Sequence, residues 1–203
     1  MKKTAITVSL FAFILACTTQ PLPYIGPVKI VNNDTLKHRI PPFKFINQNA
    51  DTITNNNLAG SIYVADFFFT SCPSICPKVK IEMLKIYDEF LNEPNFKMVS
   101  YTMDPKRDTA QKLKTYAKNL AVNTNKWMFL TGNQDDLMDI SNNGYFVAAM
   151  EDKAAPGGFD HSGRIMLIDG NGHIRGYSLG TKPKETPILI KKIKQLLKEN
   201  KNE

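Results

Sequence analysis

The sequence is poor in the residues that most often carry chemistry: its 203 residues include three cysteines, three histidines and one tryptophan. It also lacks three patterns that would indicate a function directly. It shows no internal repeat, no glycine-rich nucleotide-binding fingerprint and no serine nucleophile elbow. These absences disfavour a solenoid, a dinucleotide-binding enzyme and an α/β-hydrolase. The few cysteines and histidines are therefore the main candidates for a reactive or metal-binding site.

The N-terminal apolar run is too short to cross a membrane, which takes about 20 residues. It covers residues 5–16 and follows Lys2 and Lys3, which predicts an export signal over residues 1–16. The letters ILAC at its end resemble the lipobox of bacterial lipoproteins, in which the chain is cut before the cysteine and the cysteine is lipidated. We therefore expect Cys17 to anchor the chain to a bacterial membrane, on its extracytoplasmic, periplasmic side. The alternative is an ordinary signal peptide cut elsewhere, with Cys17 incidental.

The net charge of +7 does not indicate a nucleic-acid partner, although it is strongly basic. The lysines are scattered, and aromatic residues are not interleaved with them as a base-stacking surface would require. Removal of the export signal would also remove Lys2 and Lys3, leaving 24 basic residues against 19 acidic ones. We expect no nucleic acid among the partners of this chain.

The segment after the signal resembles a linker in composition, with prolines at positions 21, 23, 27, 41 and 42 and no sustained helical or strand period. We expect residues 17–40 to be a lipid-anchored tether that holds a folded domain, residues 41–203, off the membrane. Four apolar residues of the tether are candidates for packing on that domain: Tyr24, Ile25, Val28 and Ile30.

From residue 42 onward, strand and helix patterns alternate. Residues 43–47 and 51–54 predict a hairpin, and the almost continuously apolar residues 61–70 predict a central buried strand. Helices are expected at 77–91, at 109–121 with Asp108 and Gln111 as capping pair, at 133–141 capped by Asn133, and at the C-terminus around 189–197. Further strands are expected at 96–103, 127–131, 145–150, 164–169 and 173–178. Strands alternating with crossover helices predict an α/β sheet with parallel pairs.

Cys72 and Cys76 lie in FFFTSCPSICPKVK, where the central strand passes into a helix. This is the sheet edge at which ligands collect in open α/β folds, and Pro77 suits the first helical position. Both sulfurs should then feel the positive end of the helix, which favours the thiolate. Residues four apart on a helix have Cβ atoms about 5–6 Å apart, whereas a relaxed disulfide needs about 3.5–4.5 Å. The spacing favours a metal clamp, leaves a redox disulfide open, and makes two inert buried thiols the least favoured reading.

Two thiolates rarely complete a metal site, so a histidine ligand is expected. His38 lies in the tether, and His173 lies in a turn or strand where a structural role explains it. His161 follows a double glycine just before a strand, on a loop able to bring its imidazole over the cysteines. From its position alone, ligand and ordinary surface residue are equal alternatives.

Carboxylates near the sheet edge that carries the cysteines are candidates to contact the metal ligands. Asp104 follows a neighbouring strand and is a candidate to contact the metal ligands, whereas a helix cap suffices to explain Asp108. Asp66 interrupts a buried strand, where a lone carboxylate is costly. Two roles remain for Asp66: a local hydrogen bond, which we favour, or proton transfer beneath the cysteines.

The segments VADFFFTSCPSICP, YTMDPKRDT, FLTGN and FDHSGRIMLID occur in an order and spacing that resembles the Sco/SenC family, over about residues 40–177. The resemblance implies a thioredoxin-like fold, with a central mixed sheet flanked by helices and an N-terminal hairpin. It implies copper as the cofactor and Cys72, Cys76 and His161 as its ligands. Asp160 precedes this histidine where many relatives carry an apolar residue, which makes it a further residue expected near the ligands. A lipidated Cys17 would replace the transmembrane helix common in relatives.

The function implied is that of a copper metallochaperone, which delivers copper to the copper-site subunit of cytochrome c oxidase and receives it from other copper chaperones. Soft thiolates suit Cu(I), and an added imidazole lets the same site hold Cu(II). A structural zinc site would need four protein ligands. The alternative is a thiol–disulfide oxidoreductase in which Cys72 and Cys76 keep the cysteines of that oxidase subunit reduced. A peroxide-reducing protein would share the fold, but no peroxidatic motif is present.

Overall fold

The structure is a computed structural model that describes residues 20–32, 34–152 and 154–200. Cys17 and the predicted export signal lie outside the described residues, as do the side chains of Asp160 and His161. The buried apolar residues of the described chain extend from Ile40 to Leu197, so one core lies within this span. No helix among the described residues is both long enough and apolar enough to cross a membrane.

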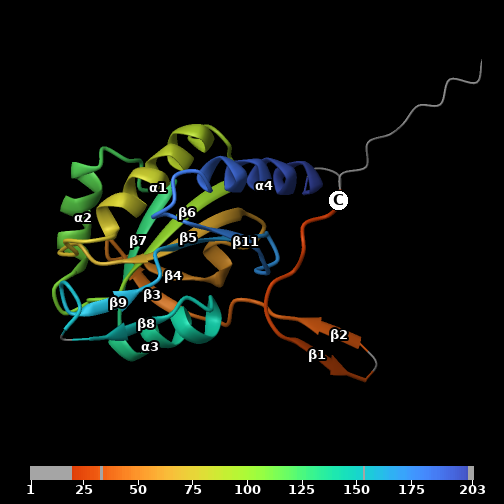
Figure 1. The fold of residues 1–203 in the computed structure, drawn as a ribbon, viewed down its shortest axis with the longest axis horizontal. Coiled ribbons are helices and arrows are strands. Elements are labelled where there is room, and N and C mark those ends of the chain that lie inside the picture. Colours follow the sequence, from red (N-terminus) through yellow and green to blue (C-terminus); the bar gives the residue numbers. More distant parts are fainter. Residues whose placement is uncertain (1–19, 33, 153, 201–203) are drawn as a thin grey trace, which may run out of the picture.

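The core of the fold is a seven-stranded mixed sheet with the order β11-β10-β5-β6-β7-β3-β4 (Figure 1). β5, β6 and β7 are parallel, and the other neighbouring pairs are antiparallel. The bounds are β3 Lys44–Asn47, β4 Thr52–Thr54, β5 Ile62–Phe68, β6 Phe96–Thr102, β7 Trp127–Thr131, β10 Arg164–Ile168 and β11 Ile174–Leu179. All seven residues of β5 are buried, as expected for a central strand covered on both faces.

Helices cover both faces of this sheet. Figure 1 shows α1 (Cys76–Phe90) and α4 (Thr186–Glu199) above the sheet, and α3 (Gln134–Asp139) with the π-helix η2 (Ile140–Gly144) below it. Helix α2 (Ala110–Asn119) packs beside β7. A 3₁₀-helix η1 (Asn55–Asn57) precedes β5, and two small separate hairpins are formed by β1 (Val28–Val31) with β2 (Asp34–Lys37) and by β8 (Ala149–Glu151) with β9 (Phe159–His161). The mixed sheet flanked by helices and the early β3–β4 hairpin are confirmed.

Three local predictions need correction. Helix α2 is capped by Thr109, whose side chain accepts a hydrogen bond from the Lys112 amide, and not by Asp108. The strand expected at 145–150 is shorter and later, because the π-helix extends to Gly144 and only residues from Ala149 onward pair with β9. The third correction concerns residues 159–161: a loop is expected there from the sequence, but they form strand β9, which pairs with β8.

The predicted cap of α3 by Asn133 is confirmed, since its side chain accepts hydrogen bonds from the Asp135 and Asp136 amides.

The first described residues of the expected tether bond to the domain. Gln195 donates from its side chain to the Gln20 carbonyl at 2.7 Å, and Arg175 donates to the Leu22 carbonyl at 2.6 Å. The Ile25 amide bonds to the Ile174 carbonyl and adds an isolated bridge to β11. Val28–Val31 and Asp34–Lys37 then pair as the β1–β2 hairpin, although the sequence there shows no sustained strand period.

Candidate metal and redox site

The two cysteines lie where β5 passes into α1. Cys72 follows the strand in a turn, in which its amide donates to the Phe69 carbonyl at 3.2 Å. Cys76 is the first residue of α1 and Pro77 the second, which agrees with the expected tight loop running into the first turn of the helix. Both residues are buried, with 8% and 5% of their surfaces exposed. The chain therefore holds both thiols together at the carboxyl edge of the parallel strands.

The two thiols have different acidities. At Cys72 the largest influence is burial, which opposes ionisation, but hydrogen bonds from the Cys76 thiol, the Cys76 and Ser74 amides and the Ser74 hydroxyl outweigh it and lower the pKa of Cys72. The Ser74 hydroxyl oxygen lies 3.6 Å from the Cys72 sulfur. At Cys76, burial and the hydrogen bond to Cys72 raise the pKa of the thiol well above its ordinary value. The direction for Cys72 agrees with the expected preference for the thiolate, and the direction for Cys76 is opposite to it.

A buried ion pair lies beneath this turn. Lys80 Nζ is 3.5 Å from Asp66 Oδ2, with side chains 6% and 1% exposed. The Ser100 hydroxyl also donates to Asp66, and Trp127 donates to the Ser100 oxygen at 2.9 Å. Asp66 is therefore not a lone carboxylate, which agrees with the favoured local role. Lys80 was not predicted as part of the site, although its position one turn after Cys76 on an otherwise buried helix face was the available signal.

Asp108 joins the two strand ends beside the cysteines. Its carboxylate accepts from the Thr70 amide at 2.9 Å and from the Thr102 hydroxyl at 2.8 Å, and the Thr70 hydroxyl donates to it as well. Because Thr70 lies two residues before Cys72, this carboxylate fixes the start of the cysteine turn. The helix-cap role expected for Asp108 is replaced by a role in bracing β5 against β6.

Asp104 reaches the site through an arginine. The carboxylate of Asp104, 3% exposed as a residue, accepts from Arg107 Nε. The same guanidinium donates from Nη2 to the Gly157 carbonyl at 2.8 Å. Gly157 belongs to the loop between β8 and β9, so this contact ties the loop after β6 to the hairpin that carries His161.

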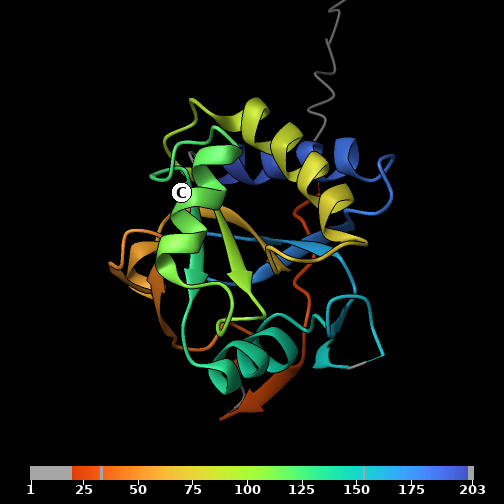
Figure 2. The same cartoon turned by 90° about the vertical axis from the view of Figure 1, so that its left-hand side faces the viewer.

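A second set of contacts brings the β8–β9 hairpin against the cysteine turn. The rings of Phe69 and Phe159 lie 5.3 Å apart. Gly157 has φ +86°, and a Cβ on it would approach Phe69 to 2.5 Å and Pro73 to 3.3 Å, so glycine permits the close approach. His161 is the last residue of β9, where its backbone pairs with Ala149. Figures 1 and 2 show the hairpin and the start of α1 at the same end of the molecule.

The ligand set expected for the metal is only partly within the described residues. Among the side chains that the structure describes, no group of three or more His, Cys, Asp or Glu is placed to hold a metal ion. Cys72 and Cys76 are brought together, and the third ligand, His161, and Asp160 stay predictions because their side chains are not described. The other two histidines have structural partners: His38 donates to the Gly144 carbonyl and His173 to the His38 carbonyl, both at 2.7 Å.

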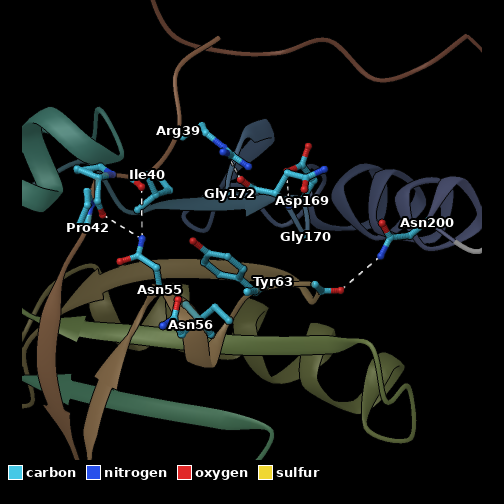
Figure 3. A pocket seen from close by; sticks show the side chains of 15 residues that line it. Arg39, Ile40, Pro42, Asn55, Asn56, Tyr63, Asp169, Gly170, Gly172 and Asn200 are labelled. Carbon is cyan, nitrogen blue, oxygen red and sulfur yellow. Dashed lines mark hydrogen bonds between the residues drawn. The ribbon is translucent and has the colours of Figure 1, made fainter. Parts of the chain in front are cut away.

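Two hollows lie at opposite ends of the sheet. A groove of about 400 Å³ between α1 and α2 opens at the cysteines, and its lining includes Cys72, Cys76, Lys80, Ile81 and Tyr116. A larger pocket of about 730 Å³ lies at the other end of β5, lined among others by Arg39, Asn55, Tyr63, Asp169 and Asn200 (Figure 3). Of these two hollows, the groove is the one whose described lining includes the two cysteines.

The SCO1/SenC family profile matches residues 32–198 of this chain. An SCO2-like protein of Rickettsia typhi is 33% identical over 192 residues, which cover 89% of both chains. An SCO1 homolog of Bacillus subtilis is 31% identical over 124 residues, 61% of this chain and 59% of that protein.

Solved structures of Sco proteins are similar to this chain in fold. The SCO1/SenC family lipoprotein of Bacillus anthracis has a TM-score of 0.73 at 26% identity, over 79% of this chain and 95% of that one. BsSco, a member of the Sco family of cytochrome c oxidase assembly proteins with a disulfide switch, has a TM-score of 0.68 at 25% identity, over 80% and 95%. Arabidopsis thaliana ScoI with copper bound has a TM-score of 0.64 at 26% identity, over 76% and 98%. The expected thioredoxin-like fold is confirmed, and this chain belongs to the Sco/SenC family.

Proposed function

We propose that this chain is a copper metallochaperone of cytochrome c oxidase assembly. The observation that carries the proposal is the pair of buried thiols at the β5–α1 junction, one with a lowered and one with a raised pKa, in a chain of the Sco/SenC family. The copper bound to Arabidopsis ScoI and the oxidase-assembly role of the family of BsSco support it. Copper is the cargo, held by Cys72, Cys76 and His161 and passed to the copper-site subunit of the oxidase.

The donor set suits a site that both accepts and releases copper. Two thiolates prefer Cu(I), and an imidazole extends the range to Cu(II). The lowered pKa of Cys72 favours its thiolate, whereas the raised pKa of Cys76 opposes the loss of the proton that metal binding requires. Burial lowers the pKa of the neighbouring Lys80, whereas the charges of Asp66 and of a Cys76 thiolate raise it, so a charged Lys80 and a Cys76 thiolate favour each other. Copper binding therefore depends on pH, because the Cys76 thiol releases a proton when the metal binds.

A second function remains in competition for the same residues. The unequal acidities of Cys72 and Cys76 suit a thiol–disulfide oxidoreductase, in which the Cys72 thiolate attacks a disulfide of the oxidase subunit. The Cys76 thiolate would then displace the partner's sulfur, leaving a Cys72–Cys76 disulfide and a reduced partner. The disulfide switch of BsSco favours keeping this alternative.

The place of action is the periplasmic side of a bacterial membrane, with the chain held by a lipid on Cys17. The lipobox-like ILAC sequence supports the anchor. The description of the Bacillus anthracis neighbour as a lipoprotein supports it as well. Other copper chaperones are the proposed source of the copper.

Copper content tests the proposed function. The purified protein, as dithiol and as disulfide, is offered Cu(I) or Cu(II), freed of excess metal and analysed for bound copper per chain. The dithiol should retain a stoichiometric copper and the disulfide essentially none, because oxidation withdraws both sulfur donors. Equal retention by both forms, or none by the dithiol, contradicts the proposal.

A further inference from the structure

The contacts between the start of the described chain and the domain limit how far the domain can lie from a membrane that holds Cys17. Gln20 is already bonded to α4 through Gln195, and Leu22 and Pro23 are bonded to Arg175. Gln20 lies only three positions after Cys17, and an extended chain spans at most about 3.5 Å per residue. If Cys17 carries the lipid, the surface around Gln20 lies within about 10 Å of the bilayer. The segment thus holds the domain close to the membrane and does not space it away.

This surface lies at the opposite end of the sheet from the cysteines. Arg175 bonds to Asp169, which follows β10, and β10 is antiparallel to β5, so Asp169 lies near the start of β5. Cys72 follows the end of the same strand, and seven residues of strand span about 20 Å. In Figure 1 the first described residues and the β1–β2 hairpin lie at the right-hand end, whereas the β5–α1 turn lies at the left.

The β1–β2 hairpin at this end has an unusual surface. Every described residue of both strands is exposed, and a hairpin of two strands is at best marginally stable in water by itself. It nevertheless presents four large apolar side chains, 46–77% exposed: Val28, Ile30, Val31 and Leu36. Figure 1 shows it projecting from the body of the domain. Such an apolar surface calls for a covering partner.

The charged residues of the hairpin indicate which kind of partner would cover its apolar side chains. Lys29 and Lys37 lie on the hairpin and Arg39 follows it, against the single acidic residue Asp34. Register places Lys37 opposite Val28 and Lys29 opposite Leu36, so each face combines apolar residues with one lysine. Lys37 Nζ also lies 3.5 Å from the centre of the Tyr24 ring, which holds the hairpin base to the domain. Apolar side chains interleaved with basic ones match the boundary between acyl chains and anionic headgroups.

We propose that the β1–β2 hairpin is a membrane-docking element. Its apolar residues enter the headgroup boundary of an anionic bilayer, Lys29 contacts lipid phosphates, and the cysteines at the far end of β5 face away from the membrane. The proposal rests on the proposed lipid anchor for the placement of Gln20, but docking itself is measurable without the lipid.

The test uses residues 17–203 with Cys17→Ser, which contain the whole described core and carry no acyl chain. This protein is sedimented with phosphatidylcholine vesicles that contain about one-third phosphatidylglycerol, and with phosphatidylcholine alone. We expect binding to the anionic vesicles, reduced about tenfold by Ile30→Ser with Val31→Ser and about fivefold or more by Lys29→Glu. The matched controls are Ile188→Ser, 55% exposed at the cysteine end of α4, and Lys184→Glu, and both should bind like the parent.

Three results would overturn the proposal: no vesicle binding by the parent, equal losses in hairpin and control variants, or a dimer in sedimentation velocity that Ile30→Ser dissociates, since a second copy would then be the partner. A failed anchor gives a different result. In that case wild-type cells would lack a lipidated form, while the Cys17→Ser protein would still bind anionic vesicles through the hairpin.

Discussion

At the scale of single residues, Cys72 and Cys76 are chemically unlike although they are four positions apart. Cys72 receives hydrogen bonds from Ser74 and from Cys76, and these stabilise its thiolate against the cost of burial. Cys76 is more deeply buried and donates a hydrogen bond to Cys72, and both effects raise the pKa of its thiol. The sequence predicted where the pair would be, because an apolar strand followed by Cys-Pro has few other placements. The sequence could not predict this difference in pKa, because it depends on which of the two sulfurs accepts the hydrogen bond between them.

Alkylation kinetics test the asymmetry. Because thiolate is the nucleophile and the pKa of Cys72 is lowered, its rate should rise with pH at a lower midpoint than the about 8.5 of a free cysteine. Cys76 should stay slow through neutral pH, because its pKa is raised. Iodoacetamide labelling followed by peptide mass spectrometry, with Cys76→Ser and Cys72→Ser as the paired controls, gives both profiles. A Cys76 that reacts faster than Cys72 at neutral pH would refute this account.

At the scale of elements, the sequence predicted those whose signals are local. The buried strand β5, helix α1 after Cys-Pro and the Asn133 cap are each set by residues within one segment. The bracing of Thr70 and Thr102 by Asp108 was missed because it joins residues 38 positions apart, and only the parallel pairing of β5 with β6 brings them together. The β1–β2 hairpin was missed because its exposed strands bury no face and so need no apolar alternation.

The β8–β9 hairpin is the element whose placement the site depends on most. Arg107 joins the loop of the hairpin to Asp104, and Phe69 packs on Phe159, the first residue of β9. We expect Arg107→Gln to raise amide hydrogen exchange in residues 154–159 about fivefold, because one hydrogen bond is worth about 1 kcal/mol. Release of copper should accelerate in parallel if His161 is a ligand.

The matched control for Arg107 lies at the other end of the sheet. Arg39 also donates from an exposed guanidinium to a loop carbonyl, that of Asn171, at 2.8 Å. Arg39→Gln should leave exchange in residues 154–159 unchanged. Unaltered exchange in the Arg107→Gln protein, measured by mass spectrometry under the same conditions, would mean that this contact does not fasten the hairpin.

At the scale of the whole molecule, the proposed membrane-docking hairpin and the candidate site lie at opposite ends of the sheet. The start of the described chain, the β1–β2 hairpin and the large pocket lie at one end of β5, and the cysteine turn, Arg107 and the β8–β9 hairpin lie at the other. With an anchor at Cys17, the metal site would point into the periplasm, where it can meet both a donor of copper and the oxidase subunit. The predicted division of the chain at residue 40 stays a prediction, although Gln20, Leu22, Pro23 and Ile25 already bond to the domain.

Fractionation of Cys17→Ser cells tests this arrangement. The variant should be released as a soluble periplasmic protein or remain unprocessed, because no thiol is left at the position of the lipid. Mass spectrometry of the N-terminal peptide shows the modification directly, with wild type as the reference. A variant that still fractionates as a lipid-modified membrane protein would rule out the lipobox interpretation.

The most direct test of copper delivery is His161→Ala, with His173→Ala as a control histidine outside the site. A dithiol reaction needs Cys72 and Cys76 but no imidazole, whereas Cu(II) held by two sulfurs loses its nitrogen donor. The variant should nearly lose Cu(II) binding and its thiolate-to-copper absorption, retain some Cu(I), still form the Cys72–Cys76 disulfide, and fail in oxidase assembly. Full rescue of assembly by His161→Ala, together with failure of Cys76→Ser, would contradict copper delivery and leave the reductase in its place.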